Sequence, residues 1–461
     1  MIEDNHQYLL NPWKRVVNAA PEACALIEAT SGRQWSFRSI DDWSRTLAEG
    51  LQPYRLKGLP VAFQQANGGA WVARFLALLR VGAAALPLDP STPAQGFREL
   101  AVRCGAVEWN DEKKPRMPTK PRRFRDPVIA LVKLTSGTTG EPRSLPFRAG
   151  ELAADGRQVM RGMKIGAGDR NLAIIPFGHS YGLGNLIMPL LLAGVPVVCG
   201  SSPLPHILAT EFAEGKANIL PAVPAMFHGL VRAGAPLPGL RLAITAGAPL
   251  PPEVARGFLD QYGQPLHNFL GSSESGGIAF DAEGEAGLTG RGVGRPLPRV
   301  SIDFDRRGRL IVSSPAVFTR GNRLASEGLG RVILGDRGAF NTHGELVLSG
   351  RARSMIKVGA RRLDPLEVER ALKEIEGVRA AWATDWSSGG ETRPAAVAAA
   401  NLNAAEIRAT LRLRLPAWKI PRPLVVVPEL PLTTMSKPDR KALIRILREA
   451  TATRKVEGND S

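Results

Sequence analysis

The chain has 461 residues, of which 44% are hydrophobic and 22% charged, and these proportions exclude a largely disordered protein. Its formal net charge is +17, because 60 lysines and arginines outnumber 43 aspartates and glutamates. Such a balance favours an anionic partner, or serves solubility alone. The densest basic run, residues 111–127, accompanies no zinc-finger, helix-turn-helix or RNA-binding signature, so nucleic acid is not the partner that we expect.

The cysteines and the apolar segments bear on the cellular compartment. Cys24, Cys104 and Cys199 have neither metal-ligand nor redox spacing, so we expect reduced, mostly buried thiols. The first residues have neither the basic nor the apolar region of a signal peptide. The longest apolar run, residues 186–199, is short and contains prolines, so no membrane span is expected. Together these features predict a cytoplasmic protein.

Strand and helix patterns alternate over the first part of the chain. They begin with residues 58–65 and 70–82. Apolar strands are predicted at residues 128–134, 171–177, 195–200, 217–223, 240–247 and 266–274, with helices at 184–194 and 251–263. Strands that are apolar throughout and alternate with helices predict an α/β fold with doubly wound, mainly parallel sheets. Ligands in such sheets bind at the carboxyl ends of the strands.

The pattern changes twice toward the C-terminus. Residues 300–314 and 338–351 alternate apolar and polar side chains around glycine turns, which predicts a β-hairpin region. A helix is then predicted from Pro365 to Gly377, with Asp364 as N-cap and Glu367 completing a capping box. Short strands and two further helices follow. We therefore predict a large N-terminal domain, residues 1–351, and a small, mobile α+β domain, residues 352–461.

The segment LTSGTTGEPRS, Leu134–Ser144, follows a predicted buried strand. Glycines and hydroxyl side chains at the carboxyl end of a strand expose backbone N–H groups that can bind phosphate. The segment matches neither the P-loop nor the dinucleotide-binding motif. Taken alone, a plain polar turn accounts for it nearly as well.

This loop and six further motifs, in the same order, resemble those of the adenylate-forming superfamily, which includes acyl- and aryl-CoA synthetases, luciferases and peptide-synthetase adenylation domains. The loop is similar to the Thr-Ser-Gly-Thr-Thr-Gly-x-Pro-Lys signature. The other motifs are PFGHSYGLGN at 176–185, TAGAPL at 245–250, LGSSE at 270–274, GD at 335–336, GRARSMIKVGARRLDPLEVE at 350–369 and PLTTMSKPDR at 431–440. The likeness extends from about Trp35 to the C-terminal region.

The resemblance implies an ATP-dependent ligase that joins a carboxylate to AMP with release of pyrophosphate. The acyl group then passes to a pantetheine thiol, either of coenzyme A or of an acidic acyl carrier protein, which the basic net charge would attract. ATP and Mg²⁺ are the implied cofactors. Attack by a carboxylate on a phosphorus surrounded by oxyanions requires positioning and cations.

The resemblance also implies the site residues. The catalytic residues would be Lys437, which bridges the carboxylate and the α-phosphate, with Glu274, His179 and Arg351. Glu274 would bind Mg²⁺ with Thr138 as its partner. The ATP-binding residues would be Thr135, Ser136, Gly137, Thr138, Thr139, Gly140 and Arg143 at the phosphates, Gly247, Ala248, Pro249, Leu270, Gly271, Ser272 and Ser273 at the adenine side, and Asp336 at the ribose. The pocket for a fatty or aromatic acyl group would contain Phe177, Gly182, Asn185, Ala246, Gly276 and Ile278.

Domain movement is a further implication. In the family the small domain closes for adenylation and then swings about a hinge, which corresponds to Arg353. The swing would bring Gly359 to the tunnel for the pantetheine arm, where a glycine permits close backbone approach.

Several positions depart from the family pattern, namely Arg143, Leu270, Leu334, Arg353, Ala360 and Ser436. These departures are compatible with a catalytically inactive nucleotide-binding scaffold, and the net charge leaves open a basic nucleic-acid-binding protein. Taken singly, Asp336 could be a turn aspartate, Glu274 a solvated loop residue, His179 a core histidine and Lys437 a surface lysine at a helix start.

Overall fold

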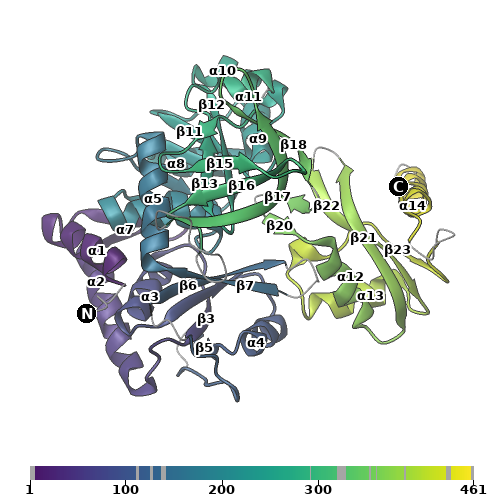
Figure 1. Cartoon of the computed structure of the whole chain (residues 1–461), viewed down its shortest axis with the longest axis horizontal. Coiled ribbons are helices and arrows are strands. Elements are labelled where there is room, and N and C mark those ends of the chain that lie inside the picture. Colours follow the sequence, from purple (N-terminus) through teal and green to yellow (C-terminus); the bar gives the residue numbers. More distant parts are fainter. Residues whose placement is uncertain are drawn as a thin grey trace. The chain divides into compact units, whose positions relative to one another are not determined.

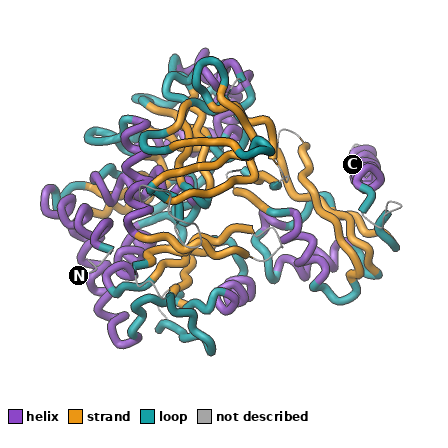
Figure 2. The backbone as a smooth tube through the Cα atoms, viewed as in Figure 1, coloured by secondary structure: helices purple, strands orange, loops and turns teal. Residues whose placement is uncertain are grey.

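The computed structural model describes residues 6–110, 114–124, 128–136, 142–290, 292–318, 329–351, 355–359, 361–388, 391–431 and 438–457. The chain forms two compact units. The first contains Met1–Pro90, Ala101–Lys133 and Ser144–Ala352, and the second contains Ser91–Leu100, Leu134–Arg143 and Arg353–Ser461. Helices and strands alternate along most of the first unit (Figure 1 and Figure 2).

A nine-stranded sheet is the largest in the first unit, with the order β14-β13-β12-β11-β10-β8-β9-β1-β2. Its strands are β1 (Cys24–Glu28), β2 (Arg33–Ser36), β8 (Asn171–Ala173), β9 (Val197–Cys199), β10 (Ile219–Ala222), β11 (Leu242–Thr245), β12 (Leu266–Ser272), β13 (Gly276–Phe280) and β14 (Arg295–Pro296). The six strands from β12 to β1 run parallel to their neighbours, and antiparallel strands lie at both edges. The predicted doubly wound, mainly parallel sheet is therefore confirmed.

Both faces of this sheet are covered, which explains why its strands are apolar throughout. On β11, Leu242 and Ile244 join one hydrophobic cluster, which also contains side chains of α5 (Ala149–Met163). Ala243 between them joins a second cluster, with α8 (Pro205–Glu214), α9 (Pro224–Ala233) and α10 (Pro252–Tyr262). Because successive side chains of a strand point to opposite faces, each face has its own core.

A second, five-stranded sheet has the order β5-β3-β4-β6-β7. Its strands are β3 (Pro60–Gln64), β4 (Ala84–Leu88), β5 (Val107–Glu108), β6 (Ile129–Ser136) and β7 (Pro142–Arg148). The remaining helices of this half of the chain are α1 (Gln7–Ala19), α2 (Phe37–Leu51), a 3₁₀ turn (Gln52–Tyr54), α3 (Gly69–Arg80), α4 (Ala94–Arg103), α6 (Ser180–Gly182), α7 (Met188–Ala193) and α11 (Glu285–Thr289). Between α6 and α7, residues Leu183–Ile187 form a π-helical turn in which Met188 N donates to Leu183 O, so the helix predicted at 184–194 is not regular.

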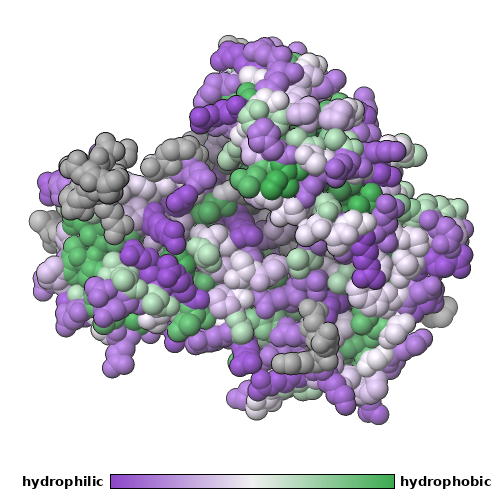
Figure 3. All heavy atoms as spheres, turned by 180° about the vertical axis from the view of Figure 1, so that it is seen from behind, coloured by the Kyte–Doolittle hydropathy of each residue, from purple (hydrophilic) through white to green (hydrophobic). Residues whose placement is uncertain are grey.

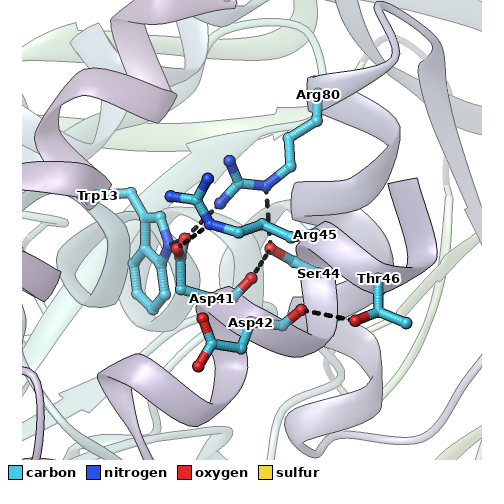
Figure 4. A network of polar contacts seen from close by, with 7 residues as sticks. All are labelled: Trp13, Asp41, Asp42, Ser44, Arg45, Thr46 and Arg80. Carbon is cyan, nitrogen blue, oxygen red and sulfur yellow. Dashed lines mark hydrogen bonds and ion pairs between the residues drawn. The ribbon is translucent and has the colours of Figure 1, made fainter. Parts of the chain in front are cut away.

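Buried Asp41 holds three of these helices together (Figure 4). Its carboxylate accepts hydrogen bonds from Trp13 Nε1 of α1 at 2.7 Å, from Arg45 Nε of α2 at 2.8 Å and from Arg80 of α3. Arg80 Nε also donates to Ser44 Oγ at 3.0 Å. Burial lowers the pKa of Arg80, and the negative charge of Asp41 opposes that shift. Since Asp41 is only 4% exposed, its partners compensate a charge that would otherwise be costly to bury.

The predicted hairpin region forms a four-stranded antiparallel sheet with the order β15-β16-β17-β18. The strands are β15 (Ser301–Phe304), β16 (Arg309–Ser314), β17 (Gly330–Phe340) and β18 (Leu346–Arg351). Gln158 of α5 donates to Ser314 Oγ at 3.1 Å, so this sheet is joined to the helix that covers the nine-stranded sheet.

The C-terminal part of the second unit is an α+β arrangement. It contains a ribbon of β19 (Ile356–Val358) and β20 (Arg361–Leu363), and a sheet of β21 (Val378–Ser388), β22 (Glu391–Ala400) and β23 (Leu424–Val427). Its helices are α12 (Pro365–Lys373), α13 (Ala404–Arg412), a 3₁₀ turn (Ala417–Lys419) and α14 (Arg440–Glu457). Side chains of α12 and α13 pack on one face of the sheet, and α14 packs on the other (Figure 1).

The start of α12 differs in one detail from the prediction. Asp364 is the N-cap and accepts from Leu366 N at 3.0 Å, as expected. Glu367 does not complete a capping box, because its carboxylate accepts a hydrogen bond from Lys419 instead. An ion pair with a lysine 52 residues away, which sequence spacing does not reveal, replaces the local bond. The strands β21 and β22, with 11 and 10 residues, are also longer than the short strands predicted.

The surface is mostly hydrophilic on one face (Figure 3), and the three cysteines are unpaired. Figure 3 shows hydrophilic side chains over most of one face, with small hydrophobic patches between them. Within the described ranges, no helix is both long and apolar enough to cross a bilayer. Cys104 and Cys199 are buried free thiols and Cys24 is half-buried, in agreement with the prediction.

Candidate functional site

Three of the predicted site segments follow neighbouring parallel strands of the first unit. The segment with His179 follows β8, the loop with Gly247 follows β11, and the turn with Glu274 follows β12. Strands β8, β10, β11 and β12 are adjacent and parallel, so their carboxyl ends lie at one edge of the sheet. The sheet therefore brings these segments together where α/β proteins bind ligands.

Tyr181 fixes the first segment across the ends of the neighbouring strands. Its hydroxyl lies 2.8 Å from Ile244 O on β11 and 3.3 Å from Ala222 O on β10, and it can donate to either. Its ring centroid is 5.8 Å from that of Phe269 on β12. Burial raises the pKa of Tyr181 well above its ordinary value of 10.0, so the hydroxyl remains a donor.

Asn67 fixes the other end of the same segment. Its amide nitrogen donates to Ile175 O at 2.9 Å, and its amide oxygen accepts from Phe177 N at 2.8 Å. These bonds replace sheet pairing, which explains why β8 ends at Ala173 although the apolar pattern continues to Phe177. Neither Asn67 nor Tyr181 was identified as a site residue from the sequence.

At two positions in these segments, the backbone arrangement favours or requires glycine. A Cβ at Gly182 would lie 2.2 Å from Pro176 O, so no larger residue fits there. Gly247, with φ of +87°, adopts a conformation that favours glycine. The neighbouring Ala248 is half-buried and Pro249 is exposed, so the loop after β11 presents its backbone at the surface.

The turn that carries Glu274 is held by Ser272. The Ser272 hydroxyl accepts from the N–H groups of Glu274 at 3.2 Å and of Ser275 at 3.1 Å. Phe318 N donates to Glu274 O at 3.2 Å. Glu274 itself is half-buried, as are Gly271 and Ser273. The turn therefore holds a carboxylate at the carboxyl edge of the sheet on a constrained backbone.

A buried lysine, Lys133, lies near enough to this carboxylate for the two charges to interact. It lies on β6, is 6% exposed, and its Nζ is 4.2 Å from the centre of the Phe147 ring. Burial lowers the pKa of Lys133, whereas the negative charges of Asp155, Glu274 and, less strongly, Glu151 raise it. Lys133 was not among the residues predicted for the site, although a lysine within the apolar run of residues 128–134 is an available signal.

Asp155 of α5 connects this lysine to the turn after Glu274. Its Oδ1 accepts from Gly277 N at 2.8 Å. A Cβ at Gly276, where φ is +68°, would lie 2.3 Å from the same oxygen, and one at Gly184 would lie 2.9 Å from Oδ2, so a side chain at either position would require Asp155 to move. Burial raises the pKa of Asp155, and the positive charge of Lys133 lowers it. Lys133, Asp155 and Glu274 form a cluster of opposite charges that the sequence did not predict.

The residues predicted for the acyl pocket lie mostly in the core of the first unit. Phe177 is fully buried with its ring centroid 5.5 Å from that of Trp71. Ala246, Leu270 and Ile278 belong to the hydrophobic cluster against which Tyr181 packs. Asn185 is 1% exposed, donates to Tyr181 O at 3.2 Å, and keeps a buried amide oxygen for which the described residues offer no hydrogen-bond donor.

His179 and Asp336 are the remaining candidate side chains of the first unit. His179 Nε2 lies 3.9 Å from Asp89 Oδ2. Asp336 is 9% exposed on β17 and stands opposite Arg351 of β18 in the antiparallel register. Ser136 and Arg351 are described only by their backbone positions in β6 and β18.

Thr135, Arg143 and Gly359 are predicted residues of the second unit that the structure describes. Thr135 Oγ1 donates to Arg143 O at 3.5 Å, and Arg143 is exposed. Gly359 lies between β19 and β20, with φ of +58° and open space where a Cβ would point. The other predicted residues, Gly137, Thr138, Thr139, Gly140, Arg353 and Lys437, and the departures Ala360 and Ser436, lie outside the described residues.

Glu274 offers a single carboxylate, which is enough for a metal ion that binds together with a nucleotide. Within the described part of the chain, no three His, Cys, Asp or Glu side chains are grouped so that they could hold a metal ion. Mg²⁺ that binds with a nucleotide needs only one or two protein carboxylates, because phosphates and water supply the other ligands. A single carboxylate on a constrained turn suits an ion that arrives with its nucleotide.

A family model described as "AMP-binding enzyme" matches residues 13–107 and 104–318 of the chain. Feruloyl-CoA synthase of Amycolatopsis is 26% identical over 372 residues, which cover 74% of this chain and 73% of that protein. Indoleacetate–CoA ligase of Aromatoleum aromaticum is 29% identical over 346 residues, covering 68% and 67%. The probable non-canonical nonribosomal peptide synthetase CymA of Salinispora arenicola is 26% identical over 457 residues, but the match covers 89% of this chain and only 6% of that protein.

Solved structures show the same fold. An o-succinylbenzoate CoA synthetase from Bacillus subtilis superposes with a TM-score of 0.80 at 21% identity, covering 94% of this chain and 98% of the other. An amide bond synthetase from Marinactinospora thermotolerans gives 0.78 at 23% identity, with coverage of 94% and 98%. The predicted fold class is thus confirmed by structures that match nearly the full length of both chains.

Proposed function

Because the chain belongs to the family of AMP-binding enzymes, we propose that it is a ligase that activates a carboxylic acid with ATP and transfers the acyl group to a thiol. The observation that carries this proposal is the meeting of three motif segments at one sheet edge, with Glu274 on a constrained turn among them. Ligands of open α/β sheets bind at such an edge, so a nucleotide and an acid would both have access to these segments.

In the first step, a carboxylate oxygen of the acid attacks the α-phosphorus of ATP. The new O–P bond forms as the bond to the β-phosphate breaks, and pyrophosphate leaves with the bonding electrons. Mg²⁺, when bound with ATP, would neutralise phosphate charge. Arg143 and residues 135–140 would hold the β- and γ-phosphates, Glu274 would hold the metal, and Lys437 would donate to the oxygens on which charge develops.

In the second step, the thiol sulfur attacks the carbonyl carbon of the acyl-adenylate. The C–S bond forms, the C–O bond to AMP breaks, AMP leaves, and the thiol proton passes to solvent. Asp336 and Arg351 would hold the ribose during both steps, and Gly247, Ala248 and Pro249 would flank the adenine. Gly359 would give the pantetheine arm room, since its turn is open.

The acid is proposed to be aromatic or a fatty acid. Ala246 and Ile278 belong to one hydrophobic cluster, against which Tyr181 packs, and this cluster reaches the carboxyl end of β11. Two relatives are named for aromatic acids, feruloyl and indoleacetate. The thiol is proposed to be pantetheine, of coenzyme A or of an acidic carrier protein, because both acceptors are anionic and the chain has a net charge of +17.

The test is pyrophosphate release from ATP and Mg²⁺ with a panel of aromatic acids and fatty acids of graded length. Coenzyme A and a phosphopantetheinylated carrier protein are then offered separately with the best acid. Glu274→Gln is expected to require more Mg²⁺ for half-maximal release, since it removes a charged ligand. Glu283→Gln, at an exposed position outside the site, is the matched control.

Three outcomes would contradict the proposal. ATP binding without pyrophosphate release for every acid would indicate an inactive scaffold. Release that does not depend on any acid would indicate simple nucleotide hydrolysis. An unchanged Mg²⁺ requirement in Glu274→Gln would remove Glu274 from the metal site.

A further inference from the structure

The second unit contains a cavity of about 600 Å³ that is lined mainly by arginine. Its walls include Arg393, Arg408, Arg412 and Arg422, with Glu391 and Trp386. The function proposed above uses none of these residues. The cavity is large enough for a small-molecule ligand, for which pockets of roughly 300–1,000 Å³ are typical.

Strand pairing places the cavity at one end of the three-stranded sheet. Trp386 on β21 is paired with Arg393 on β22, close to where β21 ends and β22 begins. Arg422 directly precedes β23, which runs parallel to β22 from the same end. Helix α13 supplies arginines from one face, and Thr451 of α14 reaches the cavity from the other. Two strands, the segment that leads into β23 and two helices thus build the cavity together.

The cavity is separate from the start of α14, the helix that follows Lys437 in the sequence. Helix α14 begins at Arg440, three residues after Lys437, and Asp439 N donates to Pro431 O, beyond the far end of β23. Thr451 lies eleven residues further along this helix, which corresponds to about 17 Å at the usual rise of 1.5 Å per residue. The cavity and the start of α14 therefore lie at opposite ends of the sheet.

The positive charge of the cavity is only partly compensated. Arg393 Nε donates to Glu391 at 3.1 Å. Arg412 and Arg422 are exposed, and neither guanidinium pairs with a carboxylate among the residues that the structure describes. Arg408 and Arg412 are four residues apart on α13, and like charges at this spacing destabilise a helix. A bound anion would offset the excess of positive charge that these lining residues carry.

We propose that this cavity binds a phosphate-bearing small molecule with at least two negative charges. Arginine presents planar, forked donors that match phosphate oxygens and keeps its charge at any physiological pH. Trp386 adds an aromatic wall on which a planar ring can stack. A concave site built from five elements suits a small molecule better than the side of a protein helix.

The test measures binding of three probes to the full chain by isothermal titration calorimetry, namely inorganic pyrophosphate, ATP and an oligoglutamate peptide. The pocket variant is Arg412→Gln with Arg422→Gln, both exposed positions, and Arg445→Gln on α14 is the matched control because it is exposed and outside the cavity. Wild type and control are expected to bind the phosphate probes at this cavity. The pocket variant is expected to bind them there about tenfold more weakly, or not at all. High salt should weaken the same site.

Comparison with the variant separates this site from the nucleotide site of the first unit, because only the cavity arginines are changed. Arg412→Lys, which keeps the charge but not the fork, is expected to lose part of the affinity. Tighter binding of ATP than of pyrophosphate at this site would indicate that the ring stacks on Trp386, and equal binding would identify the phosphates alone as the ligand. Identical phosphate binding by wild type and pocket variant would overturn the proposal. A loss of oligoglutamate binding alone in the pocket variant would also overturn it and would indicate a protein partner instead.

Discussion

Replacing Lys133 with methionine tests the charge cluster beside Glu274. Lys133 and Asp155 are 6% and 3% exposed, so each charge depends on the other for compensation. Without the lysine, the Asp155 carboxylate keeps the N–H of Gly277 but loses its positive neighbour. The Asp155 charge would then be buried without a nearby positive charge, so we expect the free energy of unfolding to fall by about 1–3 kcal/mol.

A double-mutant cycle isolates the interaction. Asp155→Asn removes the charge but keeps an oxygen for the N–H of Gly277, so it is the appropriate partner variant. The free energy of unfolding is measured in urea by circular dichroism. The double variant should lose less of it than the two single variants lose together, and the difference should be about 1–3 kcal/mol. Strict additivity, or a Lys133→Met variant as stable as wild type, would show that the charges of Lys133 and Asp155 do not compensate each other.

The pH dependence gives a second readout of the same pair. Because burial lowers the pKa of Lys133 in the folded chain, the unfolded chain binds more protons between that lowered pKa and the ordinary value of 10.5. Wild type should therefore gain stability relative to Lys133→Met as the pH rises through this interval. A constant difference would show that Lys133 is not destabilised by its burial.

Three further predictions concern other sites. Asp41→Ala should lower the free energy of unfolding in urea by about 3 kcal/mol, because it leaves Arg80 buried without its carboxylate; a loss no larger than that of an exposed aspartate would contradict this. Gly276→Ala should lower the melting temperature, since φ is +68° and the new Cβ would meet Asp155 Oδ1 at 2.3 Å; unchanged melting would exclude the clash. Burial raises the pKa of Tyr262 to about 12. An absorbance titration of wild type should therefore show one tyrosinate that forms near this pH and is missing in Tyr262→Phe. Because the unfolded chain releases this proton at lower pH, wild type should lose stability relative to the variant as the pH rises from 10.0 to 12.

The parallel sheet could be predicted from the sequence because its strands carry their own signal. Leu242, Ala243 and Ile244 are consecutive apolar residues, and a strand buried on both faces requires that pattern. The positions of His179, Gly247 and Glu274 follow from the strands that precede them, since neighbouring parallel strands end at the same edge.

The charge cluster could not be predicted because its members are distant in sequence. Lys133 lies on β6, Asp155 on α5 and Glu274 after β12, and only the packing of these elements brings the three charges together. Glu367 shows the same limit at shorter range. Its spacing from Asp364 indicated a capping box, but Lys419 competes for the carboxylate.

The arginine cavity depends on topology in the same way. Arg393, Arg412 and Arg422 belong to a strand, a helix and a loop, and they meet because β22 and β23 start at the same end of their sheet. In the sequence they are part of a diffuse positive charge, and nothing distinguishes them from arginines that are merely solvated.

Acid-dependent exchange of labelled pyrophosphate into ATP, measured without any thiol, tests the central claim most directly, because it reports only reversible formation of the acyl-adenylate. We predict exchange with at least one aromatic or fatty acid and its loss by about a hundredfold or more in Lys437→Ala, as expected when a donor to the developing charge is removed. Exchange that is absent with every acid, or that is unchanged in Lys437→Ala, would contradict the account.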